Sequence, residues 1–356
     1  MFNMKEVESL SKKYNIPQAD ILLIALNRYG IRANIDDNRI RFKIHLDIYD
    51  EIFYFAICVN TCETPFEMTD DLKLLFNGEK IATIIDVEKD TCDSTYFRRN
   101  KTELTLNSNM RSQCKGCKFC GTYNLDSADM SDLSNPDKLE RYLETILKMN
   151  DMSDFEQVVR VTLCTGCFGS ERELLDHLFM VNESFKKYGF NKRIRYIGSQ
   201  LRSDEAMKEI QENINAFSLS VTAECFSNRT SIMRKEKAEL DIYKIKDLLE
   251  RAKTHGFSAN YLYILGLESL DEMEKGMIYL HDSINRFPGV QILQNFVKEH
   301  EEYRLQEAKD VEYYLMARKR IEKIFGNDIY KPRSWENYRG LFYTQYADKE
   351  FHCIRI

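Results

Sequence analysis

The first hundred residues switch between helical and strand-like spacing of their apolar positions. Apolar side chains recur at intervals of three and four over residues 5–30, which predicts two helices. Apolar and polar side chains then alternate over residues 39–59, as they do in half-buried strands. Asn77 and Gly78 lie between two further apolar runs, a strong signal for a two-residue hairpin turn. We therefore expect a small α+β domain over residues 1–100.

From residue 101 the pattern becomes strand, loop and helix, in repetition. The six predicted strands are 102–108, 155–164, 192–199, 216–224, 258–266 and 289–297. Strands that alternate with amphipathic helices pair in parallel through right-handed crossovers. Six such units are fewer than the eight of a closed barrel. A flat, doubly wound sheet has less support, because no glycine-rich phosphate turn follows the first strand.

The predicted fold class is therefore α/β. We expect a partial (β/α)6 TIM-like barrel over residues 101–300, preceded by the small α+β N-terminal domain over residues 1–100. Residues 301–356 are expected to form a C-terminal helix and tail that close the barrel.

Composition and charge narrow the class of protein. Of the 356 residues, 43% are hydrophobic and 30% are charged, and the formal net charge is -6. A mildly acidic chain is not built to coat nucleic acid, although a local basic patch is compatible with it. The first residues lack the apolar core of a signal peptide, and the early apolar run Ile21–Leu26 is too short to span a bilayer. We expect a cytoplasmic protein without a membrane partner.

Three of the ten cysteines, Cys114, Cys117 and Cys120, follow the first predicted barrel strand at gaps of two residues. In parallel α/β folds the chemistry lies at the C-terminal ends of the strands. Three thiolates around a four-iron cluster leave one iron open to a non-protein ligand. The spacing of electron-transfer ferredoxins would add a fourth cysteine, and Asn124 stands there instead.

Other roles for the cysteines stay open. Zinc could be held by the three cysteines together with a distant ligand such as Cys164, Cys167 or a histidine. Unliganded cysteines at a rim loop would be reactive and oxidisable. Cys164 and Cys167, joined by Cys225, could also hold a second cluster, resolve a redox step or fill the core.

A three-cysteine loop after the first strand of a six-unit partial barrel resembles the radical S-adenosylmethionine (radical SAM) superfamily. Phe119, just before the last cysteine, also suits that loop. The family's usual gaps are three and then two residues, whereas this chain has two and two. The resemblance covers about residues 101–298 and implies an oxygen-sensitive [4Fe-4S] cluster whose open iron chelates SAM. It also implies that one electron cleaves SAM to a 5′-deoxyadenosyl radical, which removes hydrogen from a substrate.

The resemblance also implies contacts to SAM after the second strand. In the family, that loop carries a Gly-Gly-Glu-like segment that binds the SAM amino group. The nearest match is Gly169, Ser170 and Glu171. The ordinary alternative is a helix start, with Ser170 as its N-cap and Glu171 opposing the helix dipole.

The fourth strand of the family ends in polar residues that contact SAM, which implicates Ser220, Glu224 and Arg229. Alternation places Ser220, Thr222 and Glu224 on one face of the strand. A carboxylate buried there needs a partner, for which we expect Arg229 or Arg234. An ordinary ion pair is the alternative to a grip on the methionine part of SAM.

The fifth strand resembles the adenine-binding strand of the family through Ile264 and Gly266, with Glu268 one place early. After the third strand, Ser199, Gln200 and Arg202 lie where substrate or SAM contacts are expected. A flavodoxin or ferredoxin-type protein is implied as the reductant.

The substrate is left open by the resemblance. The acidic charge and the single barrel favour a small molecule, such as an amino acid, a nucleotide or a natural-product precursor. A peptide or RNA docked on residues 1–100 is the first alternative, and a non-catalytic iron–sulfur or zinc protein is the second.

Cys353 bears on the RNA alternative. In the RNA adenine methyltransferases of this superfamily, a cysteine near the C-terminus is methylated and passes the methyl group on. The tail around Cys353 alternates apolar and polar residues as a strand does. We therefore expect Cys353 to be structural or to occlude the barrel mouth.

Overall fold

A computed structural model describes most of the chain. The described residues are 2–90, 95–108, 117–121, 133–164, 166–326, 330–333 and 340–351. Cys92, Cys114 and Cys353 lie outside them, so the predicted roles of Cys114 and Cys353 stay predictions.

The N-terminal unit, residues 2–90, consists of two helices followed by an antiparallel sheet. The helices are α1 (Met4–Tyr14) and α2 (Gln18–Tyr29). The strands are β1 (Arg39–Leu46), β2 (Ile52–Cys58), β3 (Phe66–Met68), β4 (Lys73–Phe76) and β5 (Glu79–Lys89), in the order β2-β1-β5-β4-β3.

Local signals in the sequence explain the ends of these elements. Asn3 accepts hydrogen bonds from the first turn of α1, and Glu6 returns one to the backbone of Asn3, which makes a capping box. Asn77 and Gly78 take positive φ angles of 51° and 88° and join β4 to β5 as the predicted hairpin turn.

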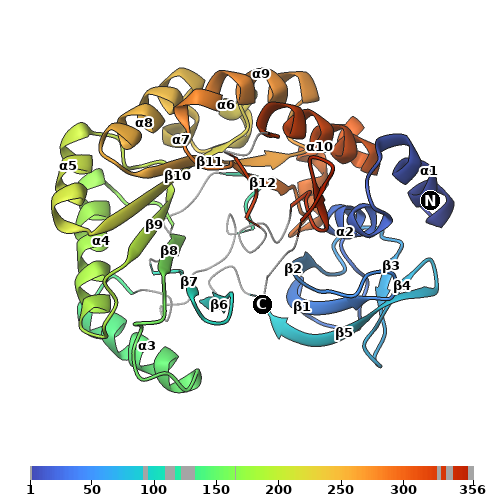
Figure 1. Ribbon diagram of the computed structural model, residues 1–356, viewed down its shortest axis with the longest axis horizontal. Helices are drawn as coiled ribbons and strands as arrows, with labels where there is room; N and C mark the ends of the chain where they lie inside the picture. The colour runs from blue at the N-terminus through green and yellow to red at the C-terminus, as the bar shows by residue number, and fades with distance from the viewer. Residues whose placement is uncertain are drawn as a thin grey trace.

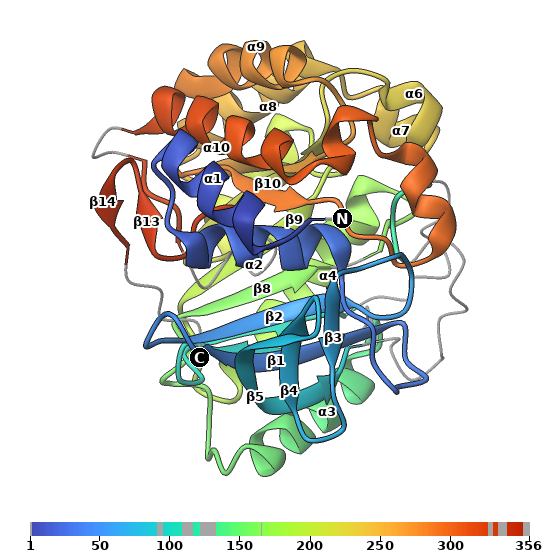
Figure 2. The same ribbon diagram turned by 90° about the vertical axis from the view of Figure 1, so that its right-hand side faces the viewer.

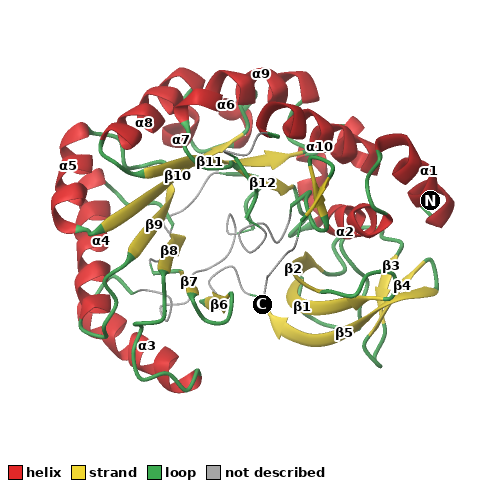
Figure 3. Cartoon of the chain, in the orientation of Figure 1, coloured by secondary structure: helices red, strands yellow, loops and turns green. Residues whose placement is uncertain are grey.

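The remaining strands form one curled sheet of seven strands, the half-barrel, with helices on its outer face (Figures 1 and 3). Its strands are β6 (Tyr96–Arg98), β7 (Glu103–Leu106), β8 (Arg160–Cys164), β9 (Arg193–Gly198), β10 (Ala216–Glu224), β11 (Ser258–Leu265) and β12 (Gly289–Ile292). Strands β7 to β12 pair in parallel and in sequence order. This arrangement fits the predicted partial TIM-like barrel.

Each parallel strand is followed by helical structure. These helices are α3 (Pro136–Met149), α4 (Glu171–Lys186), α5 (Asp204–Asn213), α6 (Arg229–Ile232), α7 (Lys235–Ala238), α8 (Ile242–Thr254), α9 (Leu270–Leu280) and α10 (Val311–Phe325). Apolar residues on one side of each longer helix pack on the sheet, as Leu139 and Leu143 do in α3. The short helices α6 and α7 were not predicted, and both lie in the loop after β10.

Three predicted boundaries are wrong. The second predicted strand, 155–164, begins only at Arg160. Residues 96–98 were expected in the N-terminal domain, but β6 pairs antiparallel with β7 and extends the half-barrel. The sixth predicted strand, 289–297, ends at Ile292, because residues 293–297 turn toward the N-terminal unit. There, the Gln294 side-chain amide donates to Asn27 Oδ1 (3.1 Å) and to the Ala56 carbonyl (2.9 Å).

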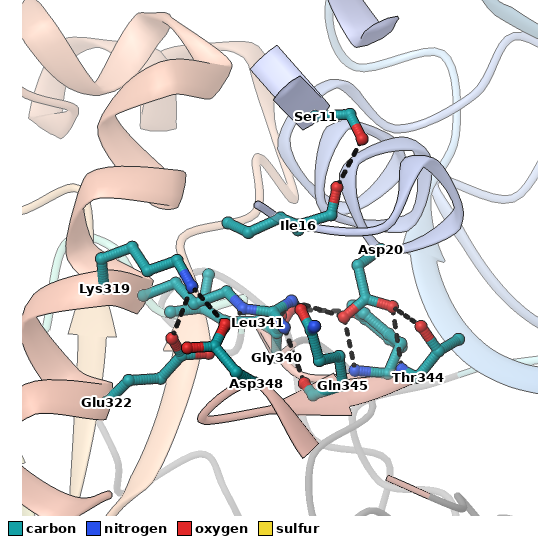
Figure 4. Close-up of polar contacts among 12 residues, drawn as sticks. Ser11, Ile16, Asp20, Lys319, Glu322, Gly340, Leu341, Thr344, Gln345 and Asp348 are labelled. Atoms are coloured by element: carbon teal, nitrogen blue, oxygen red, sulfur yellow. Dashed lines mark hydrogen bonds and ion pairs between the residues drawn. The ribbon is translucent and has the colours of Figure 1, made fainter. Parts of the chain in front are cut away.

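The N-terminal sheet lies beside the gap between β12 and β6, and helices α1 and α2 lie against α10 (Figures 1 and 2). A buried cluster fixes this junction (Figure 4). The Asp20 carboxylate pairs with Arg318 and accepts from the Thr344 backbone N–H (2.8 Å) and hydroxyl (2.7 Å). Arg318 also pairs with Glu322 (3.0 Å) and donates to the Leu341 carbonyl (2.9 Å). Because Asp20 and Arg318 are both fully buried, each needs this complete set of partners.

Cys353 and the residues after it lie outside the described part of the tail. Within the described part of this segment, a two-residue strand pair forms, β13 (Gln345–Tyr346) with β14 (Lys349–Glu350). Ala347 and Asp348 take positive φ angles between them and make a tight turn.

Among the residues that the structure describes, no helix combines the length and the apolar character needed to cross a membrane.

Candidate active site

A cavity of about 250 Å³ lies at the C-terminal ends of the parallel strands. Residues on or after each of the strands β7 to β12 contribute to its wall, and β1 of the N-terminal unit lines it from the other side. This is the edge of a parallel α/β sheet at which ligands bind. The cavity therefore defines the candidate active site.

The described part of the cysteine loop lines this cavity. Cys117, Phe119, Cys120 and Gly121 are all in its wall. The Cys120 N–H donates to the Cys117 carbonyl (3.0 Å) and forms a tight turn. A Cβ atom on Gly121 would lie 2.6 Å from the Phe296 ring, so only glycine allows this close approach.

Burial raises the pKa of the Cys117 thiol, and the charge of Lys237 opposes that effect. Within the described ranges, no three His, Cys, Asp or Glu side chains are grouped to hold a metal ion. Because Cys114 lies outside those ranges, the predicted three-cysteine ligand set stays a prediction.

The other cysteines considered from the sequence divide into two groups. Cys164 and Cys167, at the end of β8, line the same cavity. Cys225 is fully buried and does not line the cavity. Its thiol donates to the Ser227 carbonyl, with Sγ 2.9 Å from the oxygen. Burial raises the pKa of Cys225, which favours the neutral thiol of a core residue.

Glu224, at the end of β10, faces the cavity as expected, but its partner differs from the prediction. Its carboxylate pairs with Lys237 Nζ at 2.5 Å, and neither Arg229 nor Arg234 takes this role. The expected arginine partner is wrong because α6 and α7 turn the chain back and bring Lys237 of α7 to the strand end. Burial disfavours the Lys237 charge, but the Glu224 carboxylate outweighs it, and the pKa of Lys237 is raised.

A bulge aims the Glu224 side chain. In the pairing of β10 with β11, Thr222 lies opposite Leu262 and Glu224 opposite Tyr263, so one residue is unpaired between them. Glu224 has a φ of +66°, a backbone angle that residues other than glycine seldom adopt. Bulges of this kind redirect side chains next to active sites.

Arg229 and Arg234 are held by other contacts. Arg229 does not line the cavity and donates to the carbonyls of Cys225 (2.6 Å) and Lys237 (2.8 Å). Arg234 pairs with Glu236 at 2.7 Å. Arg229 therefore fixes the loop that carries Glu224 and Lys237, and any effect it has on a ligand is indirect.

The segment Gly169-Ser170-Glu171 forms a helix start and does not line the cavity. Ser170 caps α4 by accepting from the Glu173 N–H (3.2 Å). The Glu171 carboxylate accepts from the backbone N–H groups of Arg202 and Ser203, the latter at 2.9 Å. These contacts are those of the ordinary helix start that the sequence also allowed. SAM binding by these residues stays a prediction.

Ser220 shares its strand face with Thr222, but it lies deeper than the cavity wall. Its hydroxyl accepts from Arg195 Nε (2.9 Å) and donates to Asn260 Oδ1 (2.6 Å) in the buried interior. Two residues were expected to contact SAM from the fifth barrel strand, β11. Ile264 lines the cavity, and Gly266, just after that strand, does not.

Glu268 is also away from the cavity wall. Its carboxylate accepts from the Ser227 backbone N–H (2.6 Å) and from the Tyr263 hydroxyl (2.6 Å). Ser199 and Gln200 line the cavity, and the Gln200 amide also bonds the Phe168 backbone at 2.8 and 2.7 Å. Arg202 does not line the cavity, and its Nε donates to the Ser199 carbonyl (2.8 Å).

Sequence reasoning missed the contribution of the N-terminal unit. Arg39 and Arg41 of β1 and Asp90, just after β5, line the cavity. Arg39 Nε lies 2.7 Å from Asp90 Oδ2, and Arg41 Nε lies 2.9 Å from Asp90 Oδ1. The signal was present in the alternation, because residues 39 and 41 point to the same face of a strand. What faces that side is set by tertiary packing and was not readable from the sequence.

Comparisons with known proteins give only distant similarities. No protein-family model and no curated protein matches the chain. Streptococcus suis SuiB bound to S-adenosylmethionine has a TM-score of 0.36 and 13% identity, covering 55% of this chain and 42% of SuiB. SuiB bound to precursor peptide SuiA has a TM-score of 0.40 and 15% identity, covering 64% of this chain and 48% of SuiB.

A radical SAM methyltransferase from Sphaerobacter thermophilus has a TM-score of 0.39 and 13% identity, covering 73% of this chain and 74% of that one. The matched region thus spans less than half of SuiB.

Proposed function

We propose that the chain is a radical SAM enzyme in which Cys114, Cys117 and Cys120 hold a [4Fe-4S] cluster at the rim of the half-barrel. The observation that carries this proposal is the position of Cys117 and Cys120, which both line the cavity at the C-terminal ends of the parallel strands. When bound, the cluster would supply the electron that cleaves the sulfonium carbon–sulfur bond of SAM.

The residues around the two described cysteines suit such a group. Iron–sulfur clusters are held by thiolates. Burial raises the pKa of the Cys117 thiol, and the charge of Lys237 acts against that shift. Phe119 and Leu293 pack with Cys117 in one apolar cluster, which limits the access of water and oxygen. The thiol donor set therefore fits an iron–sulfur cluster.

The chain's own polar residues would position SAM beside the cluster. Glu224 and Lys237 present a carboxylate and an ammonium group to the cavity, which complement the amino and carboxylate groups of methionine. Leu262 and Ile264 give the same wall an apolar surface that suits an adenine ring. We assign SAM contacts to Glu224 and Ile264, and give Ser220, Arg229 and Gly266 supporting positions behind them.

For the substrate, a small molecule remains the first candidate because the cavity is small and partly enclosed by the N-terminal unit. A peptide is the second candidate, since the sheet that lines the cavity belongs to that separate unit. SuiB was solved with a precursor peptide, which is a property of SuiB. Methyl transfer to RNA through Cys353 is a third possibility that the described residues do not address.

Anaerobic reconstitution of the full-length protein with iron and sulfide tests the proposal. We expect a brown protein that absorbs near about 400 nm and converts SAM to 5′-deoxyadenosine when dithionite supplies electrons. Cys117→Ala and Cys120→Ala should each lose the colour and the product. The matched control is Cys62→Ala, a cysteine of the N-terminal unit that donates to the Tyr29 carbonyl.

Two results would contradict the proposal. The first is a Cys117→Ala protein that keeps both the absorbance and SAM cleavage. The second is a wild-type protein that binds zinc in place of iron and yields no 5′-deoxyadenosine, which would favour the non-catalytic alternative.

A further inference from the structure

The short helices α6 and α7 contact the described part of the cysteine loop. The Lys118 backbone N–H donates to the carbonyl of Ile232, the last residue of α6, at 2.8 Å. Ile232 and Met233 also pack with Cys117 in one buried apolar cluster. Because Lys118 lies between Cys117 and Cys120, this contact fixes the part of the loop that carries both sulfurs.

The other end of the same segment reaches the ion pair in the cavity. Lys237 of α7 lies with its Nζ 2.5 Å from the Glu224 carboxylate, and both residues line the cavity. We call residues 229–238, which include α6 and α7, the bridge segment. It contacts the predicted cluster ligands at one end and the predicted SAM contact Glu224 at the other.

A buried arginine holds the bridge segment against the end of β10. Arg229 is 6% exposed, and its guanidinium donates to the carbonyls of Cys225 (2.6 Å) and Lys237 (2.8 Å) and to that of Ala223. The planar fork of an arginine can span several acceptors in this way, which the single ammonium group of a lysine cannot do. Ala223 and Cys225 flank Glu224, so the same guanidinium also holds the backbone at the positive φ of Glu224.

We propose that Arg229 positions two sites at once, because the bridge segment that it holds supports the cysteine loop at Ile232 and the Glu224–Lys237 pair at the cavity. The inference deepens the proposed radical SAM function and rests on it for the identity of the two ligands, the cluster and SAM. Arg229 lines neither site, so it is a positioning residue. Loss of its fork should loosen the cysteine loop and displace the SAM contact together.

Alkylation of the full-length protein before reconstitution tests the position of the loop without any need for a cluster. Iodoacetamide is the probe, and mass spectrometry of the digested protein gives a rate for each cysteine. Cys117 is 9% exposed and should react slowly in the wild type. Arg229→Lys keeps the charge and loses the fork, and it should raise the Cys117 rate by at least about tenfold.

Two cysteines and one further variant serve as controls. Cys164, which lines the same cavity from the end of β8, and Cys62 of the N-terminal unit should each change by less than about twofold. Arg28→Lys is the matched variant, because Arg28 is also 6% exposed but pairs with Glu301 at 2.7 Å, away from the cavity wall. It should leave the Cys117 rate unchanged.

A second variant covers the case in which Arg229→Lys fails to fold. Ile232→Ala leaves Arg229 intact and removes part of the packing around Cys117, so it should raise the Cys117 rate by about threefold. Cys117 rates equal to the wild type in every variant that folds would overturn the proposal. An equal rise at Cys117, Cys164 and Cys62 would do the same, because it would report a general loosening of the fold.

The reconstituted protein tests the second site. At equal iron content, Arg229→Lys should raise the Kd of SAM by about tenfold in equilibrium dialysis and alter the electron paramagnetic resonance spectrum of the reduced cluster. An arginine that only stabilises the fold would leave both unchanged in the folded protein. Faster alkylation with an unchanged Kd would contradict the joint effect that we propose. A wild-type protein that binds no iron would count against the proposed function and leave the alkylation result intact.

Discussion

Two buried arginine–carboxylate clusters lie where the N-terminal unit meets the rest of the chain, and they differ in what lies beside them. At the junction with α10, Arg318 is paired with two carboxylates, Asp20 and Glu322. At the cavity, Arg39 and Arg41 both lie beside Asp90. Arg318 belongs to the packed core, whereas Arg39 and Arg41 line a cavity. Burial alone thus does not separate a structural ion pair from a candidate ligand site, but an adjacent cavity does.

The largest effect that we expect comes from the junction cluster. Asp20→Asn leaves the Arg318 charge poorly compensated in a fully buried position. The free energy of unfolding should fall by roughly 3–5 kcal/mol, measured by urea denaturation. Asp348→Asn, a change at an exposed carboxylate, should cost little. A loss in Asp20→Asn no larger than that in Asp348→Asn would erase the contrast between the clusters.

The same change at the cavity cluster should have a smaller effect. Asp90→Asn removes the charge of a carboxylate whose oxygens lie 2.7 Å from Arg39 Nε and 2.9 Å from Arg41 Nε. We expect the free energy of unfolding to fall by roughly 1–3 kcal/mol, measured by urea denaturation, because these residues line a cavity. A loss as large as that of Asp20→Asn would show that the cavity cluster is a structural unit like the junction.

A balanced pair at the same cavity offers an intermediate case. Glu224→Gln breaks the 2.5 Å pair with Lys237. We expect the cluster content to stay unchanged and the SAM affinity to fall by about tenfold, or about 1.4 kcal/mol. Equilibrium dialysis against SAM provides the measurement, with Glu239→Gln as an exposed control on the same loop. Unchanged SAM affinity with a lower melting temperature would make Glu224 a purely structural residue.

The smallest effect is expected at Glu171. Its carboxylate accepts from backbone N–H groups at the start of α5 and does not line the cavity. Glu171→Gln should lower the free energy of unfolding by about 1 kcal/mol, as the loss of a helix cap does. SAM affinity should be unaffected. A drop in SAM affinity as large as that of Glu224→Gln would restore the contact that the resemblance implies.

The regular elements were readable from the sequence because their signals are local. The strand Ala216–Glu224 was predicted to the residue from alternation, and the Asn77-Gly78 hairpin from its turn chemistry. Glu224 and Ile264 were placed correctly at the cavity because position along a parallel strand fixes height in the barrel. Ser220 does not line the cavity, because residues two positions apart on a barrel strand lie in different layers, and its hydroxyl bonds Asn260 in the layer below.

The contacts that the sequence did not predict are made between distant segments. Lys237 reaches Glu224 only because two short helices reverse the chain after β10. Arg39 and Arg41 reach the cavity only because the N-terminal sheet lies beside the gap between β12 and β6. The alternation places Arg39 and Arg41 on one face of their strand, but no local pattern shows which element that face meets.

The separation of Asp20 and Arg318 along the chain also bears on the order of folding. These residues are 298 positions apart, so α2 cannot gain its buried partner until α10 has been synthesised. During translation, Asp20 must stay hydrated, and the N-terminal unit must wait without its final contacts. Bringing such distant segments together carries a large loop-closure entropy, which slows docking. The nascent chain therefore exposes the side of α2 that packs on α10 for most of its synthesis, a period in which chaperone binding would protect it.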